Sequence, residues 1–139
     1  MCQRLYDIGF HNRKSWSIDL DKILKSIPSD LENHFIRGLF DGDGCIKYYQ
    51  YSYIKNPQFH FGVTGVKNVC EYIKDKFKID RKLVFEGNKT YTVVTRDITI
   101  ILNIFDYLYR DATIYLDRKY KTFKEIQMIT FNDYNKAIS

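Results

Sequence analysis

Cysteine, proline and glycine are scarce in this chain of 139 residues, which contains 3, 2 and 7 of them. The three cysteines are far apart and form no Cys-x-x-Cys pair, so the sequence indicates neither a zinc ribbon nor a redox motif. The low glycine and proline content excludes collagen-like and low-complexity polymers. Separate thiols in odd number are typical of a reducing compartment, so we expect an intracellular protein.

Long hydrophobic runs are also absent from the sequence. The longest nearly apolar stretch, residues 98–105, is too short to cross a bilayer. Residues 1–7 lack the apolar stretch of a signal peptide. We therefore expect a cytoplasmic protein with no membrane partner.

Aromatic residues, by contrast, are abundant: 12 Tyr, 10 Phe and 1 Trp make up 17% of the chain. With 45% hydrophobic residues overall, the sequence has enough apolar surface to exclude a disordered chain. The length corresponds to one domain. A net charge of +5 is compatible with an acidic partner, but many soluble domains carry as much, so it decides little by itself.

Hydrophobic periodicity predicts an α+β domain with two antiparallel hairpins. We expect a short helix or extended piece over residues 20–27 and helices over residues 29–41, 66–77, 97–109 and 116–131. Strands are expected over residues 45–55, 58–64, 82–85 and 89–95. Ser29 and Glu32 are spaced as a capping box, and Asp97 is a candidate helix cap. Residues 1–28 are interpreted as a separate leading segment and residues 29–139 as the domain.

The sequence Asp-Gly-Asp-Gly at residues 41–44 puts two carboxylates at the end of a predicted helix. The helix dipole is negative there and disfavours each carboxylate by about 0.3–1 kcal/mol. A divalent cation would reverse this argument, because it binds clustered oxygen ligands. The alternative is a polar turn in which Asp41 and Asp43 are turn residues. A calcium loop is excluded, because no Glu follows at the required spacing.

Residues 36–44 resemble the LAGLIDADG motif of homing endonucleases, in the variant that ends in Phe-Asp-Gly-Asp-Gly. Residues 61–65 resemble the end of the family's second strand, and residues 116–120 resemble the Leu-x-Arg-Lys-Tyr run that opens its late helix. Residues 5–27 resemble the segment before the second motif in double-motif members. The resemblance therefore covers nearly the whole chain.

The resemblance implies an αββαββα fold whose four-stranded antiparallel sheet forms half of a DNA-binding saddle. Two such units would pack through their motif helices, where small residues four positions apart permit close approach. The seam residues expected here are Phe35, Gly38, Leu39 and Gly42.

The resemblance also implies a catalytic Mg²⁺ or Mn²⁺ ion. Asp43 would bind it, the backbone carbonyl of Gly44 would lie beside it, and Asp41 would belong to the metal site mainly by shaping the helix end. Asp43 is thus a catalytic candidate, together with the basic residues Lys119 and Arg118, for which a solvated helix face is the alternative.

No carboxylate occurs between Asp43 and Glu71, and a surface without acids suits a polyanion. Strand alternation gives this region one outward face, which the resemblance places on DNA. Tyrosine also packs well on a pleated surface, so some of these rings are candidates for packing alone. The predicted DNA-binding residues are Lys47, Tyr49, Tyr51, Tyr53, Lys55, Gln58, His60, Thr64, Arg81, Lys82, Lys89, Thr90, Thr92 and Arg96.

The sequence thus predicts a metal-dependent, site-specific endonuclease that cuts double-stranded DNA as a homodimer. A two-fold protein would read a roughly palindromic target. The alternative is a DNA-binding protein that does not cleave, or one half of a double-motif enzyme whose partner is a missing first repeat.

Overall fold

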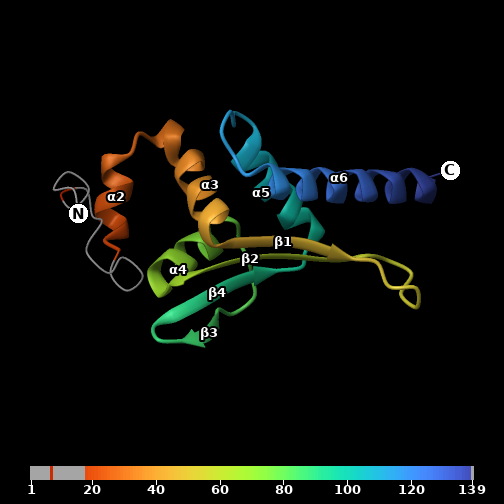
Figure 1. Ribbon diagram of the computed structural model, residues 1–139, viewed down its shortest axis with the longest axis horizontal. Helices are drawn as coiled ribbons and strands as arrows, with labels where there is room; N and C mark the ends of the chain where they lie inside the picture. The colour runs from red at the N-terminus through yellow and green to blue at the C-terminus, as the bar shows by residue number, and fades with distance from the viewer. Residues whose placement is uncertain (1–6, 8–17, 139) are drawn as a thin grey trace.

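The computed structural model describes Asp7 and residues 18–138 (Figure 1). Most of the leading segment therefore lies outside the described residues. The elements in chain order are α2 (Leu20–Ser26), the 3₁₀ turn η1 (Ser29–Leu31), α3 (Glu32–Asp43), β1 (Gly44–Tyr49), β2 (Gln58–Val66), α4 (Lys67–Lys76), β3 (Val84–Gly87), β4 (Thr90–Thr95), α5 (Ile98–Tyr109) and α6 (Asp117–Ile138). From α3 to α5 the order is αββαββα, so the predicted fold class is confirmed.

The four strands form one antiparallel sheet in the order β1-β2-β4-β3. Helices α3, α4 and α6 contact the sheet, and α5 packs against α3 and α6 (Figure 1). Ile46 of β1 and Phe61 of β2 face these helices and are buried. Every second residue of β1 after Ile46 points to the opposite face, and Lys47 and Tyr49 on that face are exposed. The sheet therefore has one face in the core and one face directed outward.

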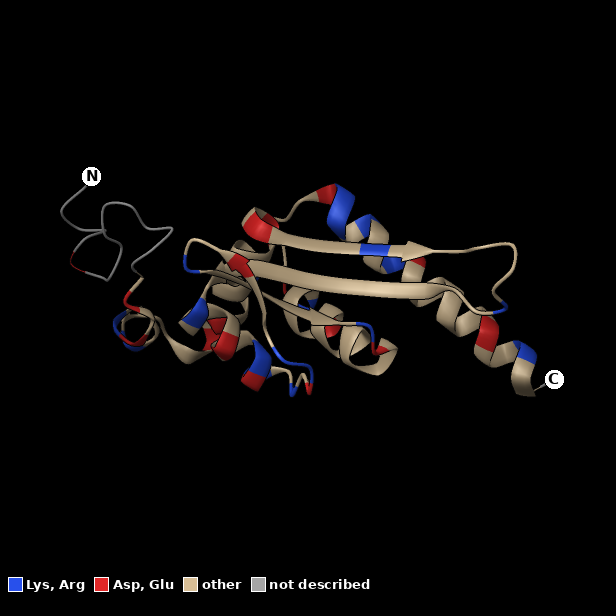
Figure 2. Ribbon diagram, turned by 90° about the horizontal axis from the view of Figure 1, so that it is seen from below, with Lys and Arg blue, Asp and Glu red and all other residues tan. Residues whose placement is uncertain are grey.

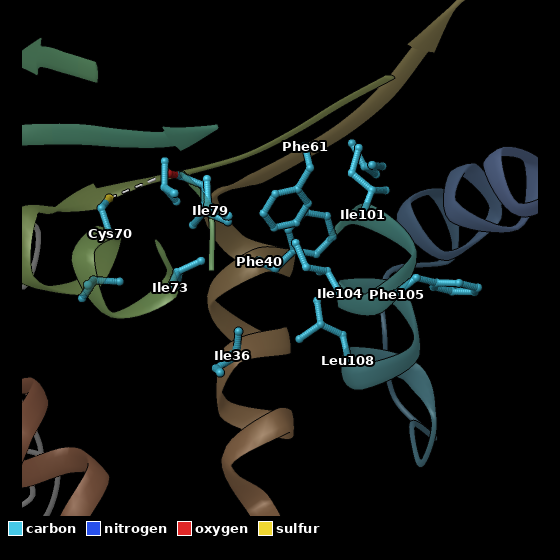
Figure 3. Close-up of a cluster of buried hydrophobic side chains, with 14 of the residues drawn as sticks. Ile36, Phe40, Phe61, Cys70, Ile73, Ile79, Ile101, Ile104, Phe105 and Leu108 are labelled. Carbon is cyan, nitrogen blue, oxygen red and sulfur yellow. Dashed lines mark hydrogen bonds between the residues drawn. The ribbon is translucent and has the colours of Figure 1, made fainter. Parts of the chain in front are cut away.

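An aromatic cluster holds α3 on the sheet. Phe40, within the motif, is fully buried and stacks on Phe61, with ring centroids 5.2 Å apart. Phe123 of α6 lies 5.5 Å from Phe40 by the same measure. Figure 3 shows Phe40 beside Phe61, next to Ile104 and Leu108 of α5. Full burial of one such side chain stabilises the fold by about 1.5–3 kcal/mol, so these rings hold the inner side of α3 against the sheet.

The predicted capping box at the start of α3 is wrong. Residues 29–31 form a 3₁₀ turn, and no side chain caps the following helix. The Glu32 carboxylate instead accepts a hydrogen bond from the Tyr72 hydroxyl and lies 3.2 Å from Nζ of Lys76. These partners lie on α4, so a tertiary contact replaces the local one that the spacing predicts.

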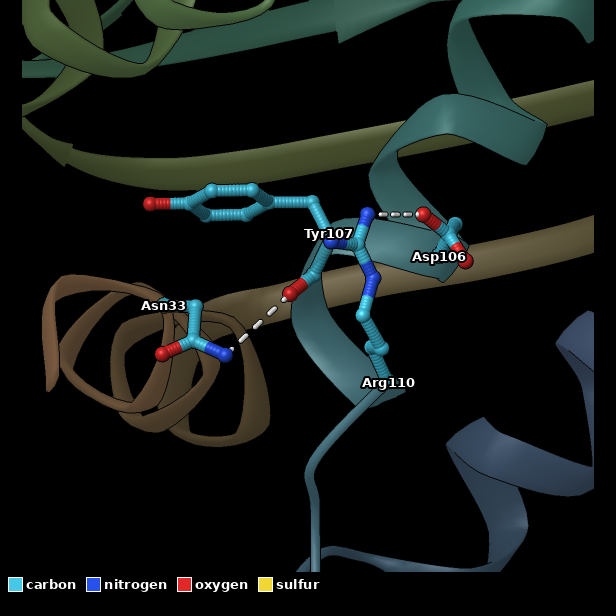
Figure 4. A network of polar contacts seen from close by, with 4 residues as sticks. All are labelled: Asn33, Asp106, Tyr107 and Arg110. Carbon is cyan, nitrogen blue, oxygen red and sulfur yellow. Dashed lines mark hydrogen bonds and ion pairs between the residues drawn. The ribbon is translucent and has the colours of Figure 1, made fainter. Parts of the chain in front are cut away.

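A second contact ties the first turn of α3 to α5. The Asn33 amide donates to the backbone carbonyl of Tyr107 over 3.4 Å, and the exposed pair Asp106–Arg110 lies on the same helix (Figure 4). Because Asn33 is bonded to the backbone, this contact fixes the helices relative to each other whatever side chain stands at position 107.

Several predicted boundaries also need correction: β3 spans Val84–Gly87 rather than residues 82–85, and β2 continues to Val66. The strand expected over residues 45–55 ends at Tyr49, because its partner β2 begins at Gln58, opposite Tyr49. Residues 50–57 form a loop held by its own hydrogen bonds. The last helix runs to Ile138, seven residues beyond the prediction of 131. The predicted cap Asp97 is confirmed, since its carboxylate accepts from the amides of residues 99 and 100.

In the part of the chain that the structure describes, no helix combines the length and the apolar character needed to cross a membrane.

Candidate nucleic-acid interface and metal site

The face of α3 turned away from the aromatic cluster borders a groove of about 790 Å³. All four predicted seam residues line it: Phe35, Gly38, Leu39 and Gly42. A Cβ atom built on either glycine would have no described atom within 4 Å. Ile18, Val66 and Val69 line the other side, so the groove is largely apolar. The predicted seam is therefore an open face, and nothing in the described chain requires the glycines to be small.

Asp43, the last residue of α3, lies at the end of this groove. Its side chain is exposed and accepts no hydrogen bond from the described residues. Thr64 and Gly65 of β2 line the groove beside it. The carboxylate thus stands where the seam face of α3 meets the sheet, and it is available to a ligand.

Gly44 lets the chain pass directly from α3 into β1. A Cβ atom here would collide with the Phe40 ring and lie 2.5 Å from the Phe40 carbonyl oxygen. A larger residue would have to displace a fully buried ring. Gly44 therefore sets how close the strand comes to the helix end, and it places the Asp43 carboxylate at the edge of the sheet.

Asp41 points in another direction. One carboxylate oxygen accepts from the backbone amide of Leu116 over 3.3 Å, and the other is buried without a hydrogen-bond partner among the described residues. The hydroxyl of Tyr109 is likewise buried without a hydrogen-bond partner among the described residues. Burial, and then the Asp41 charge, raises the pKa of the Tyr109 phenol. The two carboxylates of the motif thus diverge. That Asp41 shapes the helix end and lies at a metal stays a prediction.

Lys119 caps the C-terminal end of α3 from the first turn of α6. Its ammonium donates to the carbonyl oxygens of Phe40 and Asp41, the latter over 2.9 Å, and its side chain is only 4% exposed. A cation at this end complements the helix dipole. Burial, and then the charge of Arg118, lowers the pKa of Lys119, while the charges of Asp41 and Asp43 act in the opposite direction. Arg118 itself is exposed. The catalytic assignment of both residues stays a prediction.

The sequence reading gave no role to Arg37, which is 7% exposed. Its guanidinium donates to the carbonyl oxygens of Leu108 over 2.8 Å and Ile114 over 3.0 Å, and it lies 2.7 Å from Nδ1 of His34. Arg37 and Asp41, one helical turn apart, thus bind α3 to the connection between α5 and α6. The sequence does contain a sign of this role: Arg37 directly follows the buried position 36, and Asp41 follows Arg37 by four residues, one helical turn.

On the outward face of the sheet, cations gather around His60. Lys47 is directly opposite His60 in the β1–β2 register. Burial lowers the pKa of His60, and the charges of Lys47, Arg96 and Arg81 lower it further. Four of the predicted DNA-binding residues are therefore brought within electrostatic range of one another, although Arg81 and Arg96 lie far from Lys47 in the sequence.

The other predicted DNA-binding residues are spread along the sheet and its loops. Tyr49 pairs with Gln58, and Thr64 pairs with Thr92, whose hydroxyls lie 2.8 Å apart. Between Gly44 and Val66 the only charged residues are Lys47 and Lys55, so this half of the sheet carries no acidic colour in Figure 2. The remaining predicted residues are in the 50–57 loop (Tyr51, Tyr53, Lys55), before β3 (Lys82), in the β3–β4 turn (Lys89) and at the start of β4 (Thr90).

No protein-family model matches the sequence, and no curated protein matches it. Solved structures do match. The LAGLIDADG homing endonuclease I-GzeII in complex with its DNA target has a TM-score of 0.60 and 20% identity, over 82% of this chain and 40% of that chain. The homing endonuclease I-CvuI, in complex with a DNA target in the presence of Mg, has a TM-score of 0.56 and 16% sequence identity, over 73% of this chain and 67% of that chain. I-TnaI, another homing endonuclease, has a TM-score of 0.55 and 13% sequence identity, over 77% of each chain. The chain thus spans about two fifths of I-GzeII, and these similarities establish a shared fold.

Proposed function

We propose that this chain, which has the fold of the LAGLIDADG homing endonucleases, is a divalent-metal-dependent endonuclease that acts on specific double-stranded DNA sites as a homodimer. One observation carries the proposal. The exposed Asp43 carboxylate stands at the junction of an open apolar helix face and the β1–β2 part of the sheet, whose residues 44–66 include no acid. Solved structures of the same fold are bound to DNA, which supports the choice of ligand.

The residues present fit a divalent cation only in part. Among the described residues, no group of three His, Cys, Asp or Glu side chains is placed to hold a metal. One chain thus offers the Asp43 carboxylate and a nearby carbonyl such as that of Gly44. One or two protein ligands are enough for Mg²⁺, because this ion keeps several of its bound waters. When bound, the ion would lower the pKa of a water and neutralise charge on the phosphate.

Other groups of this chain have defined tasks in the proposal. Lys119 fixes the end of α3 and so orients Asp43. Lys47, Arg96 and Arg81 would hold phosphates of the duplex on the outward face. Each would contribute a counter-charge without reading sequence, whereas Gln58 and Thr92 offer hydrogen bonds to base edges.

The open groove supports pairing with a second unit. Gly38 and Gly42 leave the backbone of α3 accessible along one side, and Phe35 and Leu39 flank them. The same helix from a second copy would cover this apolar surface and bring a second Asp43 close to the first. Because each strand of DNA needs its own attacking water and leaving oxygen, two carboxylates on a two-fold axis would serve a double-strand cut.

The alternative is a protein that binds DNA without cutting, or one unit of a two-motif enzyme whose partner is a first repeat. The observation that favours it is the number of carboxylates, since one chain presents one suitable group. Solution mass distinguishes the two, and the homodimer predicts a species near twice 16.7 kDa.

The test of cleavage compares Asp43→Asn with Asp133→Asn, an exposed residue of α6 outside the site. Both variants and the unmodified chain are incubated with a library of random-sequence duplexes and Mg²⁺, and cut molecules are sequenced. We expect Asp43→Asn to bind DNA normally and to cut nothing, while Asp133→Asn cuts the same sites as the unmodified chain. Cutting by Asp43→Asn would reject the assignment, and loss of DNA binding would assign Asp43 a structural role.

A further inference from the structure

Three tyrosines form a stacked ladder that continues β1 beyond the sheet. The rings of Tyr49 and Tyr51 have centroids 5.8 Å apart and planes inclined by 15°. The rings of Tyr51 and Tyr53 follow at 5.4 Å and 27°. Exposure rises along the ladder, from 39% at Tyr49 and Tyr51 to 81% at Tyr53. The last ring therefore offers most of its surface to a ligand.

The segment that carries the ladder is ordered by its own contacts. The amide of Ile54 donates to the carbonyl of Tyr51 over 3.1 Å, and the side-chain amide of Gln50 donates to the carbonyl of Ile54 over 3.2 Å. Figure 1 shows this loop extending past the end of the sheet, away from α2 and α3. The rings thus lie on a projecting, hydrogen-bonded loop, at the opposite end of β1 from Asp43.

The charged residues on the hairpin that carries the ladder are positive, whereas the nearby Glu125 carboxylate of α6 is bound to Tyr48, the neighbour of Tyr49 in the sequence. Nζ of Lys47 lies 5.6 Å from the centroid of the Tyr49 ring, at the base of the ladder. Lys55 follows Tyr53 by two residues, and no carboxylate occurs between residues 43 and 71. Aromatic rings next to cations on a segment without acids are the combination that binds unpaired nucleic acid, in which bases stack on the rings and the backbone lies against the cations.

Duplex DNA does not expose base faces that could stack on such rings. Its base faces are stacked inside the helix, and the grooves show only base edges. The ladder presents ring faces and ring edges on a protruding loop, which match an unpaired base. Most of the Tyr53 ring is exposed, so a base placed on it would extend the stack by one step at little cost in ordering.

We propose that the Tyr49–Tyr51–Tyr53 ladder is a stacking platform for unpaired nucleobases, a second nucleic-acid site beside the duplex-binding face. Single-stranded DNA and single-stranded RNA share the chemistry it recognises. The site does not depend on metal or on cleavage, so it stands or falls separately from the proposed nuclease activity.

The test compares oligomers of equal charge. Fluorescence anisotropy is measured for the unmodified chain with labelled oligo-dT, with labelled oligo-rU and with an abasic oligomer of the same length, all without divalent metal. Stacking of one base on an aromatic ring is worth about tenfold in affinity or more, so we expect at least this preference for a base-bearing oligomer over the abasic one. Preference for oligo-dT alone assigns the site to DNA, and preference for oligo-rU alone assigns it to RNA.

Variants locate the binding. Tyr51→Ala with Tyr53→Ala should reduce affinity for the base-bearing oligomers to the abasic level, whereas Tyr51→Phe with Tyr53→Phe should retain it, because stacking needs the ring and not the hydroxyl. Tyr134→Ala, which removes an exposed ring of α6, is the matched control and should change nothing. Equal affinity of the unmodified chain for abasic and base-bearing oligomers would overturn the proposal, as would an equal loss in the Tyr134 variant.

Discussion

The ammonium of Lys119 lies 2.9 Å from the carbonyl oxygen of Asp41, seventy-eight residues earlier in the chain. It also donates to the carbonyl of Phe40, so a side chain of α6 caps the helix that carries the Asp-Gly-Asp-Gly motif. Through this contact the position of Asp43 depends on the late helix.

Lys119→Met should destabilise the fold. It removes the ammonium that donates to the carbonyl oxygens of Phe40 and Asp41, and of the described donors to the Phe40 oxygen only the Gly44 amide remains. A buried polar group that loses its partner costs about 1–3 kcal/mol. Urea unfolding measures this loss. Lys121→Met, at an exposed position on the same helix, is the control and should change the free energy of unfolding by less than about 0.5 kcal/mol. If Lys119 served only catalysis, its replacement would leave the unfolding curve in place.

Gly44→Ala should be far more harmful than Gly42→Ala. The added methyl group at position 44 would strike the buried Phe40 ring, whereas at position 42 no described atom lies within 4 Å. We expect a loss of about 1–3 kcal/mol from overpacking in the first case. In the second we expect no loss, and a gain of up to about 1 kcal/mol because Ala favours helix over Gly. Thermal unfolding compares the two variants at a protein concentration low enough to keep the chain monomeric, so that changes at the pairing face do not enter. Similar effects would contradict the role given to Gly44.

Gly38→Leu should prevent dimerisation without unfolding the chain. A Cβ atom at position 38 has no described atom within 4 Å in the single chain, so the groove can accept a side chain there. That side chain would occupy the surface on which a second α3 packs. Sedimentation velocity should show a monomer, and circular dichroism should show unchanged helix content. Ser29→Leu, at an exposed position outside the groove, provides the control. A Gly38→Leu dimer as stable as that of the unmodified chain would refute the seam.

Binding to duplex DNA should tighten as pH falls through the usual pKa of histidine, about 6.5. In the free chain, burial and the cations Lys47, Arg96 and Arg81 lower the pKa of His60, so its ring is neutral at pH 7. Phosphates bound on this face would offset those cations and raise the pKa again. Binding then takes up a proton, and linkage makes affinity rise as pH decreases.

Anisotropy titrations between about pH 7.5 and about pH 5.5 measure this effect, because the neighbouring Lys and Arg side chains do not titrate there. His60→Gln should bind with little change over the same range. His11 and His34 remain in this variant and serve as internal controls. A variant with the full pH dependence would exclude His60 from the interface.

Local patterns in the sequence were sufficient for much of this fold. The apolar spacing at residues 36 and 40 places one side of α3 in the core, and both are buried. The alternation in residues 58–64 assigns Phe61 and Val63 to the core and leaves Gln58 outside. Asp97 caps α5 as its position predicts, because a carboxylate one residue before a helix reaches the first free amides without help from the rest of the chain.

Other features were decided by partners distant in sequence. Glu32 is drawn to Tyr72 and Lys76 on α4, although its spacing from Ser29 fits a capping box. The first strand ends at Tyr49, since strand length depends on how many residues of β2 are available to pair. A single sequence carries no record of such pairings.

The sequence by itself determined the order of helices and strands, the outward face of the first hairpin and the motif at residues 36–44, because hydrophobic period, caps and turn residues act over a few positions. Only the tertiary structure decided that Asp41 and Asp43 diverge, that Lys119 caps α3, and that Lys47, Arg81 and Arg96 surround His60. Those arrangements depend on contacts between elements tens of residues apart, whose geometry arises only when the sheet and helices pack into one core.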